Sequence, residues 1–186
     1  QDFYGAAIGI AKTQDFKSFT RIENPFIPFN RNAVLFPRKI NGNYVMLSRP
    51  SDSGHTPFGD IFLSESPDMT FWGKHRHVMG KTSEWWESVK IGGGAAILDI
   101  DEPSRVKYRC ENFLLTPETW YEERGFVPNV CFPCATIHDS ETGKIALYYG
   151  AADSYVGVAF TTLDEIVDYI KDHSLVREED TELGIR

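Results

Sequence analysis

The sequence predicts an all-β fold, a β-propeller, with a single helix near the C-terminus. Three observations lead to this prediction: short apolar strands that recur in a unit of about 50 residues, hairpin-type turns within each unit, and helix signals confined to the last part of the chain. Units of this length with four short strands are typical of propeller blades.

The first repeated segment is a strand followed by a turn. It appears as GIAKTQDFKSF and again as DIFLSESPDMTFW, so that Thr13 and Asp15 correspond to Ser66 and Asp68. In both copies an apolar strand precedes a hydroxyl residue, an aspartate follows two positions later, and an aromatic residue closes the segment. A looser copy, GVAFTTLDEI, begins at Gly157. Self-similarity of this kind indicates stacked copies of one supersecondary unit.

A second repeated segment supplies the rest of the unit. NAVLFPRKINGNYVMLSRPSD resembles NVCFPCATIHDSETGKIALYYGAAD: an asparagine, a strand, Phe-Pro, a strand, a Gly-containing turn, a strand, and a loop that ends at Asp52 or Asp153. The turns NGN and DSETGK are typical of β-hairpins. The unit is thus predicted to be a four-stranded antiparallel meander. A β-sandwich also has short, evenly spaced strands, but a repeated loop aspartate favours a propeller, where equivalent loops meet at one end. We therefore expect Asp52 and Asp153 at the same end.

The predicted helix lies in TTLDEIVDYIKDHS, where Thr162 and Glu165 have the spacing of a capping box. Its apolar residues fall on one face: Leu163, Ile166, Val167 and Ile170. We expect this helix to pack on the outside of the last blade.

Composition excludes several classes of protein. The chain has 186 residues and is 41% hydrophobic, so it can bury a core, and its net charge of −8 argues against general nucleic-acid binding. No apolar run approaches the ~20 residues of a membrane span, and the N-terminal segment lacks the basic start of a signal peptide. Three cysteines, an odd number, favour a reducing compartment, so we expect a cytoplasmic protein without membrane contact.

The motif CFPC, with Cys131 and Cys134, raises the alternative of a thiol oxidoreductase. Redox motifs of this spacing lie where a strand runs into a helix. Here Pro133 lies inside an extended run, and no thioredoxin-like βαβ pattern surrounds it. Ligands for a structural zinc ion are also too few nearby. The preferred interpretation is a pair of buried or half-buried thiols.

Three cations lie near predicted strand ends: Arg31, Arg49 and Lys90. If those ends share the mouth of the channel, positive charge converges on one face of an acidic protein. A compact anion such as phosphate suits this arrangement, because guanidinium groups bind its oxygens bidentately. Pro50 ends the strand directly after Arg49, and Gly54 allows close approach of the backbone to a ligand.

Polar and aromatic side chains near these cations suit a sugar. Carboxylate and imidazole groups can bind hydroxyls, and indole rings can stack on a sugar ring. The candidates are Asp52, His55, Asp60, Asp153, Trp85 and Trp86.

Several long motifs together resemble glycoside hydrolase family 130: FNRNAVLFPRKINGNYVMLSRPSDSGHTPFGDIFLSESPDM, KIGGG, VPNVCFPCATI and YYGAAD. Within the family they look most similar to the branch that acts on mannosylglucose. The resemblance implies a five-bladed propeller that cleaves β-mannosides, either mannosylglucose or β-1,4-mannooligosaccharides, with inorganic phosphate and inversion. The product would be α-mannose 1-phosphate, and no cofactor is implied beyond phosphate as co-substrate.

The resemblance also implies roles for single residues. Arg31, Arg49 and Lys90 match the family's phosphate-binding positions. His55 and Asp153 match positions that contact the sugars, and Asp60 is a weaker candidate. No metal site is implied, and the oligomeric state stays open, a homo-oligomer included.

The chain departs from the family pattern in two places. The family's general acid is an aspartate in an Asp-Pro-Arg motif, which this sequence does not contain, and it is expected before Gln1. A stretch between KIGGG and ILDIDEP is also absent. We therefore expect a propeller domain over residues 1–174 that is incomplete at its N-terminus and near 92–96, with a break or strained join there, and an acidic tail over 175–186. A non-catalytic carbohydrate-binding propeller without the acid is the alternative function.

Overall fold

The computed structural model describes residues 5–51, 58–84, 91 and 96–176 of the chain. The chain divides into two compact units, the first formed by Gln1–Gly93 with Leu98–Val106 and the second by Gly94–Ile97 with Lys107–Arg186. In the described residues, no helix is long and apolar enough to cross a membrane.

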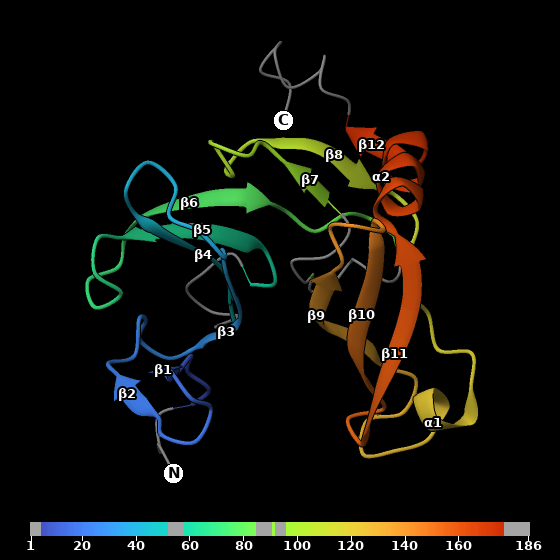
Figure 1. Ribbon diagram of the computed structural model, residues 1–186, viewed down its shortest axis with the longest axis horizontal. Coiled ribbons are helices and arrows are strands. Elements are labelled where there is room, and N and C mark those ends of the chain that lie inside the picture. The colour runs from blue at the N-terminus through green and yellow to red at the C-terminus, as the bar shows by residue number, and fades with distance from the viewer. Residues whose placement is uncertain (1–4, 52–57, 85–90, 92–95, 177–186) are drawn as a thin grey trace. The chain divides into compact units, whose positions relative to one another are not determined.

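The first unit contains the predicted meander (Figure 1). Its four antiparallel strands lie in the order β3-β4-β5-β6, with β3 at Asn30–Leu35, β4 at Tyr44–Pro50, β5 at Ile61–Ser66 and β6 at Gly73–Met79. The predicted NGN turn precedes β4, with Asn41 at φ 49° and Gly42 at φ 82°. Two consecutive positive φ angles are typical of a type I′ hairpin turn. A short hairpin of β1 (Ile10–Lys12) and β2 (Thr20–Ile22) precedes the meander.

The core of the first unit centres on the two middle strands of the meander. Buried residues run without interruption from Val45 to Arg49 on β4, so both faces of that strand are covered. Met46 and Leu63 are each 2% exposed. Burial on both faces explains why β4 is apolar at most positions instead of alternating with polar residues.

The strand-and-turn repeat is confirmed at the level of single hydrogen bonds. In the first copy the Thr13 hydroxyl accepts from the Phe16 N–H at 2.9 Å, and the Asp15 carboxylate accepts from the next two N–H groups. In the second copy the Ser66 hydroxyl accepts from the Met69 N–H at 2.8 Å, with Asp68 in the role of Asp15. Phe16 and Met69 both have positive φ. The shared sequence pattern therefore builds the same turn twice.

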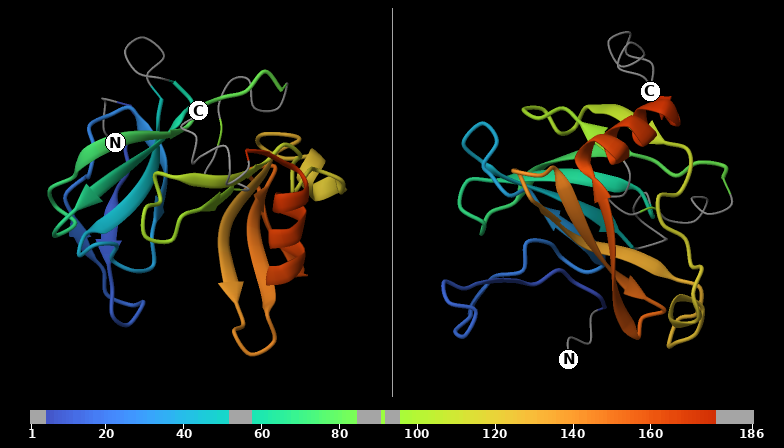
Figure 2. Two further views of the ribbon diagram at one scale, coloured as in Figure 1. Left: turned by 90° about the horizontal axis from the view of Figure 1, so that it is seen from above. Right: turned by 45° about the vertical axis from the view of Figure 1, so that its right-hand side comes forward.

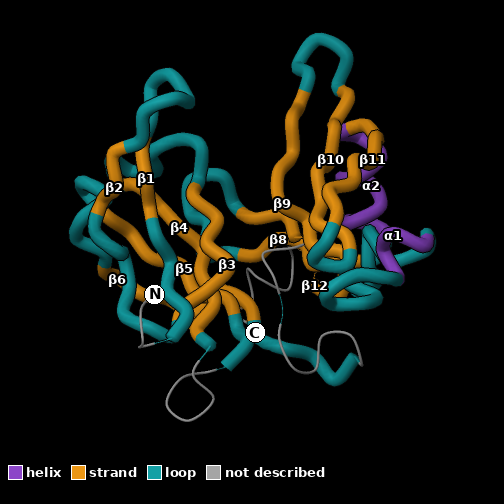
Figure 3. Tube along the Cα trace, turned by 90° about the horizontal axis from the view of Figure 1, so that it is seen from below, coloured by secondary structure: helices purple, strands orange, loops and turns teal. Residues whose placement is uncertain are grey.

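The second unit holds two sheets (Figures 1 and 3). One has the order β11-β10-β9, and the other has the order β12-β8-β7. Their bounds are β7 at Ala96–Leu98, β8 at Val106–Cys110, β9 at Cys131–His138, β10 at Lys144–Ala151, β11 at Tyr155–Thr162 and β12 at Ser174–Val176. Each of these sheets has three described strands, whereas the sequence predicted four strands in each repeat. β12 also extends the ordered structure past residue 174 and pairs with β8, far earlier in the chain.

The predicted C-terminal helix is α2, Leu163–Asp172, and it runs beside β11 (Figure 2). Its capping box is formed: the Glu165 N–H donates to the Thr162 hydroxyl at 3.3 Å, and the Thr162 N–H donates to the Glu165 carboxylate at 2.9 Å. Ile170 is its buried residue. A second helix, α1 (Trp120–Glu123), was not predicted, because one turn leaves too short a periodic pattern to recognise.

Candidate active site

Two of the predicted phosphate-binding residues lie opposite each other in one sheet. Arg31 on β3 and Arg49 on β4 are a cross-strand pair in the antiparallel register. Side chains paired in this way leave the same face of the sheet, with Cβ atoms about 5 Å apart. Two positive charges at this spacing repel each other, so the pair favours an anion nearby.

The structure fixes one of these two side chains firmly. Arg49 is 9% exposed, whereas Arg31 is exposed. The Arg49 Nη1 donates to the Ile91 carbonyl at 3.1 Å, and the Ile91 N–H donates to the Gly59 carbonyl at 3.0 Å. Burial, and then the charge of Arg31, lower the pKa of Arg49, although a guanidinium remains charged at neutral pH. The charged group is therefore held in place by contacts within the chain itself.

No carboxylate neutralises this pair in the part of the chain that the structure describes. Arg38 forms an ion pair with Asp101, but neither Arg31 nor Arg49 forms one with any described Asp or Glu. A buried charge without a partner is costly, and buried charges in proteins are normally paired. A bound anion such as phosphate would supply the missing negative charge.

Asn32 is a further polar residue at this place, and the sequence analysis did not select it as a site residue. It lies in the β-bulge of β3 between Arg31 and Val34, at φ 55°. Its side-chain Nδ2 is buried and has no hydrogen-bond partner among the described residues. Asn129, at the same position of the second repeat, has φ 57°. The signal for this residue in the sequence was the asparagine repeated in the two segments. The Asn32 amide donor, unpaired among the described residues, also favours an acceptor beside Arg31.

The Asp60 carboxylate is already hydrogen-bonded to other side chains of the protein. It accepts from His77 Nε2 at 3.0 Å and from Lys81 Nζ at 2.8 Å, and its side chain is 14% exposed. Burial alone would raise the pKa of Asp60, but the hydrogen bonds from Lys81 and His77 lower it below its ordinary value. These contacts hold the end of β6 against β5, and the predicted sugar contact of Asp60 stays a prediction.

Asp153 lies in the second unit, in the turn that joins β10 to β11. It is exposed, and Ala152 and Asp153 both have left-handed backbone conformations, at φ 48° and φ 49°. Its carboxylate is hydrogen-bonded to no described residue. The predicted contact of Asp153 with a sugar hydroxyl stays a prediction.

The other predicted site residues lie outside the described residues: Asp52, His55, Trp85, Trp86 and Lys90. Their roles stay predictions, as does the expectation that Asp52 and Asp153 share one end of the propeller. The predicted break or strained join between Gly92 and Ala96 falls on the same undescribed part.

The CFPC cysteines lack the setting of a redox motif. Both lie inside β9, an extended strand, and both thiols are free. Burial, and the nearby Glu122 carboxylate, raise the pKa of the Cys131 thiol to about 11. Reactive cysteines have lowered pKa values and lie in electropositive surroundings. The structure therefore argues against the oxidoreductase alternative.

We expect the Cys131 thiol to remain protonated up to at least pH 9. Thiolate absorbance followed against pH, in a variant with Cys110→Ser and Cys134→Ser, measures this group alone. A titration midpoint far above the ordinary value of about 8.5 agrees with the structure, whereas a midpoint below neutrality would restore the redox interpretation.

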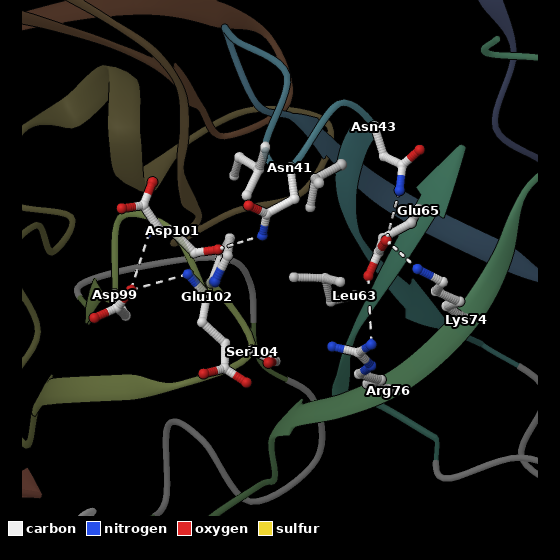
Figure 4. Close-up of a pocket in the computed structure, with 13 residues that line it drawn as sticks. Asn41, Asn43, Leu63, Glu65, Lys74, Arg76, Asp99, Asp101, Glu102 and Ser104 are labelled. Carbon is white, nitrogen blue, oxygen red and sulfur yellow. Dashed lines mark hydrogen bonds and ion pairs between the residues drawn. The ribbon is translucent and has the colours of Figure 1, made fainter. Parts of the chain in front are cut away.

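A separate cavity of about 490 Å³ lies in the first unit, at the other end of β4 (Figure 4). Glu65 lies on one side of it and accepts from Lys74 Nζ and from Asn43 Nδ2, each at 2.9 Å. Carboxylates of the 99–102 turn lie on the other side. Asn43 precedes β4 and Arg49 lies near its end, so the cavity is about 20 Å from the arginine pair. Its polar groups largely pair with one another, and it holds none of the predicted site residues.

Comparisons with known proteins match this chain to one family. The sequence profile of glycoside hydrolase family 130, described as β-1,4-mannooligosaccharide phosphorylase, matches residues 1–97 and 93–172. A β-1,4-mannooligosaccharide phosphorylase of Ruminococcus albus is 56% identical, over 91% of this chain and 59% of its own length. A 4-O-β-D-mannosyl-D-glucose phosphorylase of Bacteroides fragilis is 28% identical, over 88% of this chain and 50% of its own length. The mannosylglucose branch, which the motifs had suggested, is thus the more distant one.

A solved structure of a related phosphorylase is similar to this chain. The β-1,2-mannobiose phosphorylase of Listeria innocua, in complex with β-1,2-mannobiose, superposes with a TM-score of 0.84 at 29% identity. The match covers 91% of this chain and 54% of that one. The predicted fold, part of a propeller with a C-terminal helix, is confirmed. This chain spans between half and three-fifths of the length of these relatives, and it belongs to glycoside hydrolase family 130.

Proposed function

We propose that this chain forms the phosphate-binding and part of the sugar-binding site of an inverting phosphorylase that acts on β-1,4-linked mannooligosaccharides. The observation that carries the proposal is the Arg31–Arg49 pair, two adjacent cations without a carboxylate partner among the described residues. The substrate class is supported by the R. albus relative, which is named for β-1,4-mannooligosaccharides and is 56% identical to this chain.

The arginine pair suits phosphate as the nucleophile. An inverting glycosidase needs a carboxylate that activates water, whereas phosphate is already an anion and needs cations that position it. Phosphate oxygen would form a bond to the anomeric carbon as the bond from that carbon to the bridging oxygen breaks. Arg49, held by the Ile91 carbonyl, would fix the anion from below the sugar ring. Lys90 is proposed as a third cation.

Other residues are proposed for the two remaining roles, proton donation and sugar binding. The bridging oxygen must receive a proton from a carboxylic acid, and the family places this acid in the Asp-Pro-Arg motif that the present sequence lacks. Asp153 and His55 are proposed to bind sugar hydroxyls, with Asp60 as a weaker candidate. Among the described residues, no group of three or more His, Cys, Asp or Glu side chains is arranged to hold a metal ion.

The deciding experiment is the phosphate dependence of turnover. The protein as its gene encodes it is incubated with β-1,4-mannobiose with and without inorganic phosphate, and the products are followed by phosphorus and proton NMR. We expect α-mannose 1-phosphate with phosphate present and no cleavage without it. Mannosylglucose is expected to be the poorer substrate.

Two other results would point elsewhere. Cleavage that proceeds equally well without phosphate would identify a hydrolase. Binding of mannobiose without any turnover, with phosphate present, would favour the non-catalytic carbohydrate-binding propeller.

A further inference from the structure

The turn that carries Asp153 has an unfavourable backbone. Ala152 and Asp153 follow each other with φ 48° and φ 49°. The left-handed region is uncommon for residues other than glycine, and alanine has no side-chain oxygen to compensate for it. Residues in such conformations persist only where the surrounding structure holds them, and they cluster at functional sites. Contacts with neighbouring residues must therefore hold this turn in its left-handed conformation.

A segment that follows α1, residues 125–130, lies directly against the turn. The Val127 N–H donates to the Ala152 carbonyl at 3.2 Å, and the Ala152 N–H donates to the Val130 carbonyl at 2.8 Å. The Phe126 N–H donates to the Ser154 hydroxyl at 2.9 Å. The turn is thus fixed by backbone hydrogen bonds from outside its own hairpin.

Glycine is required where this segment meets the turn. A Cβ atom at Gly125 would lie 2.4 Å from the Ala152 carbonyl oxygen and 2.6 Å from the Ser154 hydroxyl. Real Cβ atoms do not approach a backbone oxygen so closely, so the segment can lie this near only with glycine there.

A buried carboxylate ties this segment back to the strand that leads into the turn. Glu122 of α1 accepts from the Tyr149 hydroxyl of β10 at 2.5 Å with one oxygen. Its other oxygen accepts from the Glu118 and Thr119 N–H groups, each at 2.8 Å. Glu122 and Tyr149 are each 4% exposed. The closed path runs from β10 through Tyr149 and Glu122, along residues 125–130, and back to Ala152.

The Tyr149 ring has little freedom to move away from this contact. A Cβ atom at Gly157 of β11 would lie 2.3 Å from the Tyr149 Cζ, so the ring lies directly against that glycine. Burial alone would raise the pKa of Glu122, but the hydrogen bonds from Tyr149 and from the two N–H groups lower it to about 2. The carboxylate is therefore charged at neutral pH, and in the described residues no Lys, Arg or His side chain pairs with it. The Tyr149 hydrogen bond, instead of a salt bridge, joins the two segments, and the two N–H groups before α1 hold the carboxylate in place.

We propose that Glu122 and Tyr149 are positioning residues that hold the Asp153 turn in its left-handed form and thereby set the affinity for the mannoside. The inference rests on the proposed function, in which Asp153 binds a sugar hydroxyl. Neither residue touches the substrate in this proposal. They act through the 125–130 segment on the direction of the Asp153 side chain.

The test is Tyr149→Phe in the protein as its gene encodes it, with separate KM values for β-1,4-mannobiose and phosphate. The substitution removes one hydroxyl and keeps the ring on Gly157. We expect the KM for mannobiose to rise about tenfold, in the range of losing one hydrogen bond to a charged group, with the KM for phosphate unchanged. A merely structural role would lower kcat through loss of folded enzyme and leave both KM values as they are, which would overturn the proposal.

A matched control and a second variant test the same proposal. Tyr148→Phe makes the same change one residue earlier, where the hydroxyl is hydrogen-bonded to no described residue, and it should leave both KM values unchanged. Ser154→Ala breaks the contact with Phe126 at the other end of the path without emptying a buried site. It should raise the KM for mannobiose in the same selective way, and to a smaller extent. If Tyr149→Phe does not fold, an unchanged KM for mannobiose in Ser154→Ala overturns the proposal.

Asp153→Asn separates this proposal from the proposed function. If Asp153→Asn leaves the KM for mannobiose unchanged, the sugar contact of Asp153 is wrong, and the positioning role falls with it. If Asp153→Asn raises that KM but Tyr149→Phe and Ser154→Ala do not, the positioning role alone is wrong.

Discussion

Replacing Arg49 with methionine is expected to lower kcat/KM for phosphate about a thousandfold, the upper range for losing one group that stabilises transition-state charge. Methionine keeps most of the apolar stem that the buried arginine packs with its neighbours. The guanidinium charge and its fork of donors are lost. The KM for the mannoside should change little, because the proposed sugar contacts come from other residues.

The same variant should remain folded. Arg49 forms no ion pair with a described carboxylate, so its removal leaves no buried negative charge behind. The Ile91 carbonyl loses its donor, at a cost of about 1 kcal/mol. Unfolding in urea, followed beside the kinetic assays, would show a nearly unchanged midpoint. Large loss of activity with little loss of stability is characteristic of a ligand site.

Two further variants show whether the fork or the charge is responsible. Arg49→Lys keeps the charge and removes the bidentate geometry, so phosphate use should fall about tenfold to a hundredfold. Arg38→Met is the matched control, since Arg38 is a surface arginine of the same unit paired with Asp101, and it should behave like the unaltered protein. Equal losses of phosphate and mannoside use in a folded Arg49→Lys variant would contradict the phosphate role.

Replacing Glu122 with alanine is expected to destabilise the protein by about 3 kcal/mol, the sum of leaving a buried hydroxyl and two N–H groups without their acceptor. The Tyr149 hydroxyl and the Glu118 and Thr119 N–H groups are those donors. The effect should appear as a lower urea midpoint with an unchanged slope. A shift below about 0.5 kcal/mol would show that solvent replaces these hydrogen bonds at little cost.

The contribution of Glu122 should also depend on pH in one direction. Its pKa is lowered from an ordinary 4.5 to about 2 in the folded chain. Between these values the unfolded chain binds more protons than the folded one, so stability falls as the pH decreases through this window. Tyr149 and Cys131, which face the carboxylate, have raised pKa values and stay neutral there.

Other acids, such as Asp15 and Asp60, also have lowered pKa values in the folded chain and contribute to the pH dependence of the unaltered protein. The quantity to measure is therefore the difference in unfolding free energy between the unaltered chain and Glu122→Gln. We expect this difference to be constant above pH 5 and to shrink towards pH 2. A difference that is independent of pH would show that folding does not lower the pKa of Glu122.

The features that the sequence predicted well are local ones. The NGN turn, the Thr162–Glu165 capping box and the two Thr/Ser–Asp turns each depend on residues within four positions of one another. Their chemistry is complete in a short stretch of sequence, so the pattern alone identifies them. The repeat then led to the meander, because β3 to β6 pair in chain order.

Features formed between distant residues could not be predicted from the sequence in this way. The partners of Asp60 are 17 and 21 residues away, and nothing near Asp60 in the sequence indicated that its carboxylate is already bound. The Glu122–Tyr149 contact spans 27 residues and depends on how α1 packs on β10. Arg31 and Arg49 were selected by their positions near strand ends, but only the register of β3 and β4 shows them as direct neighbours.

The pairing of β12 with β8 has a consequence for biosynthesis. The Arg109 N–H donates to the Ser174 hydroxyl, which lies 65 residues later in the chain. At translation rates of 5–20 residues per second, β8 emerges from the ribosome roughly 3 to 13 seconds before its partner strand. During that interval one edge of β8 has open backbone donors and acceptors, which can pair with other chains. A nascent chain stalled just after α2 should therefore be more prone to aggregation than one extended by the few residues of β12.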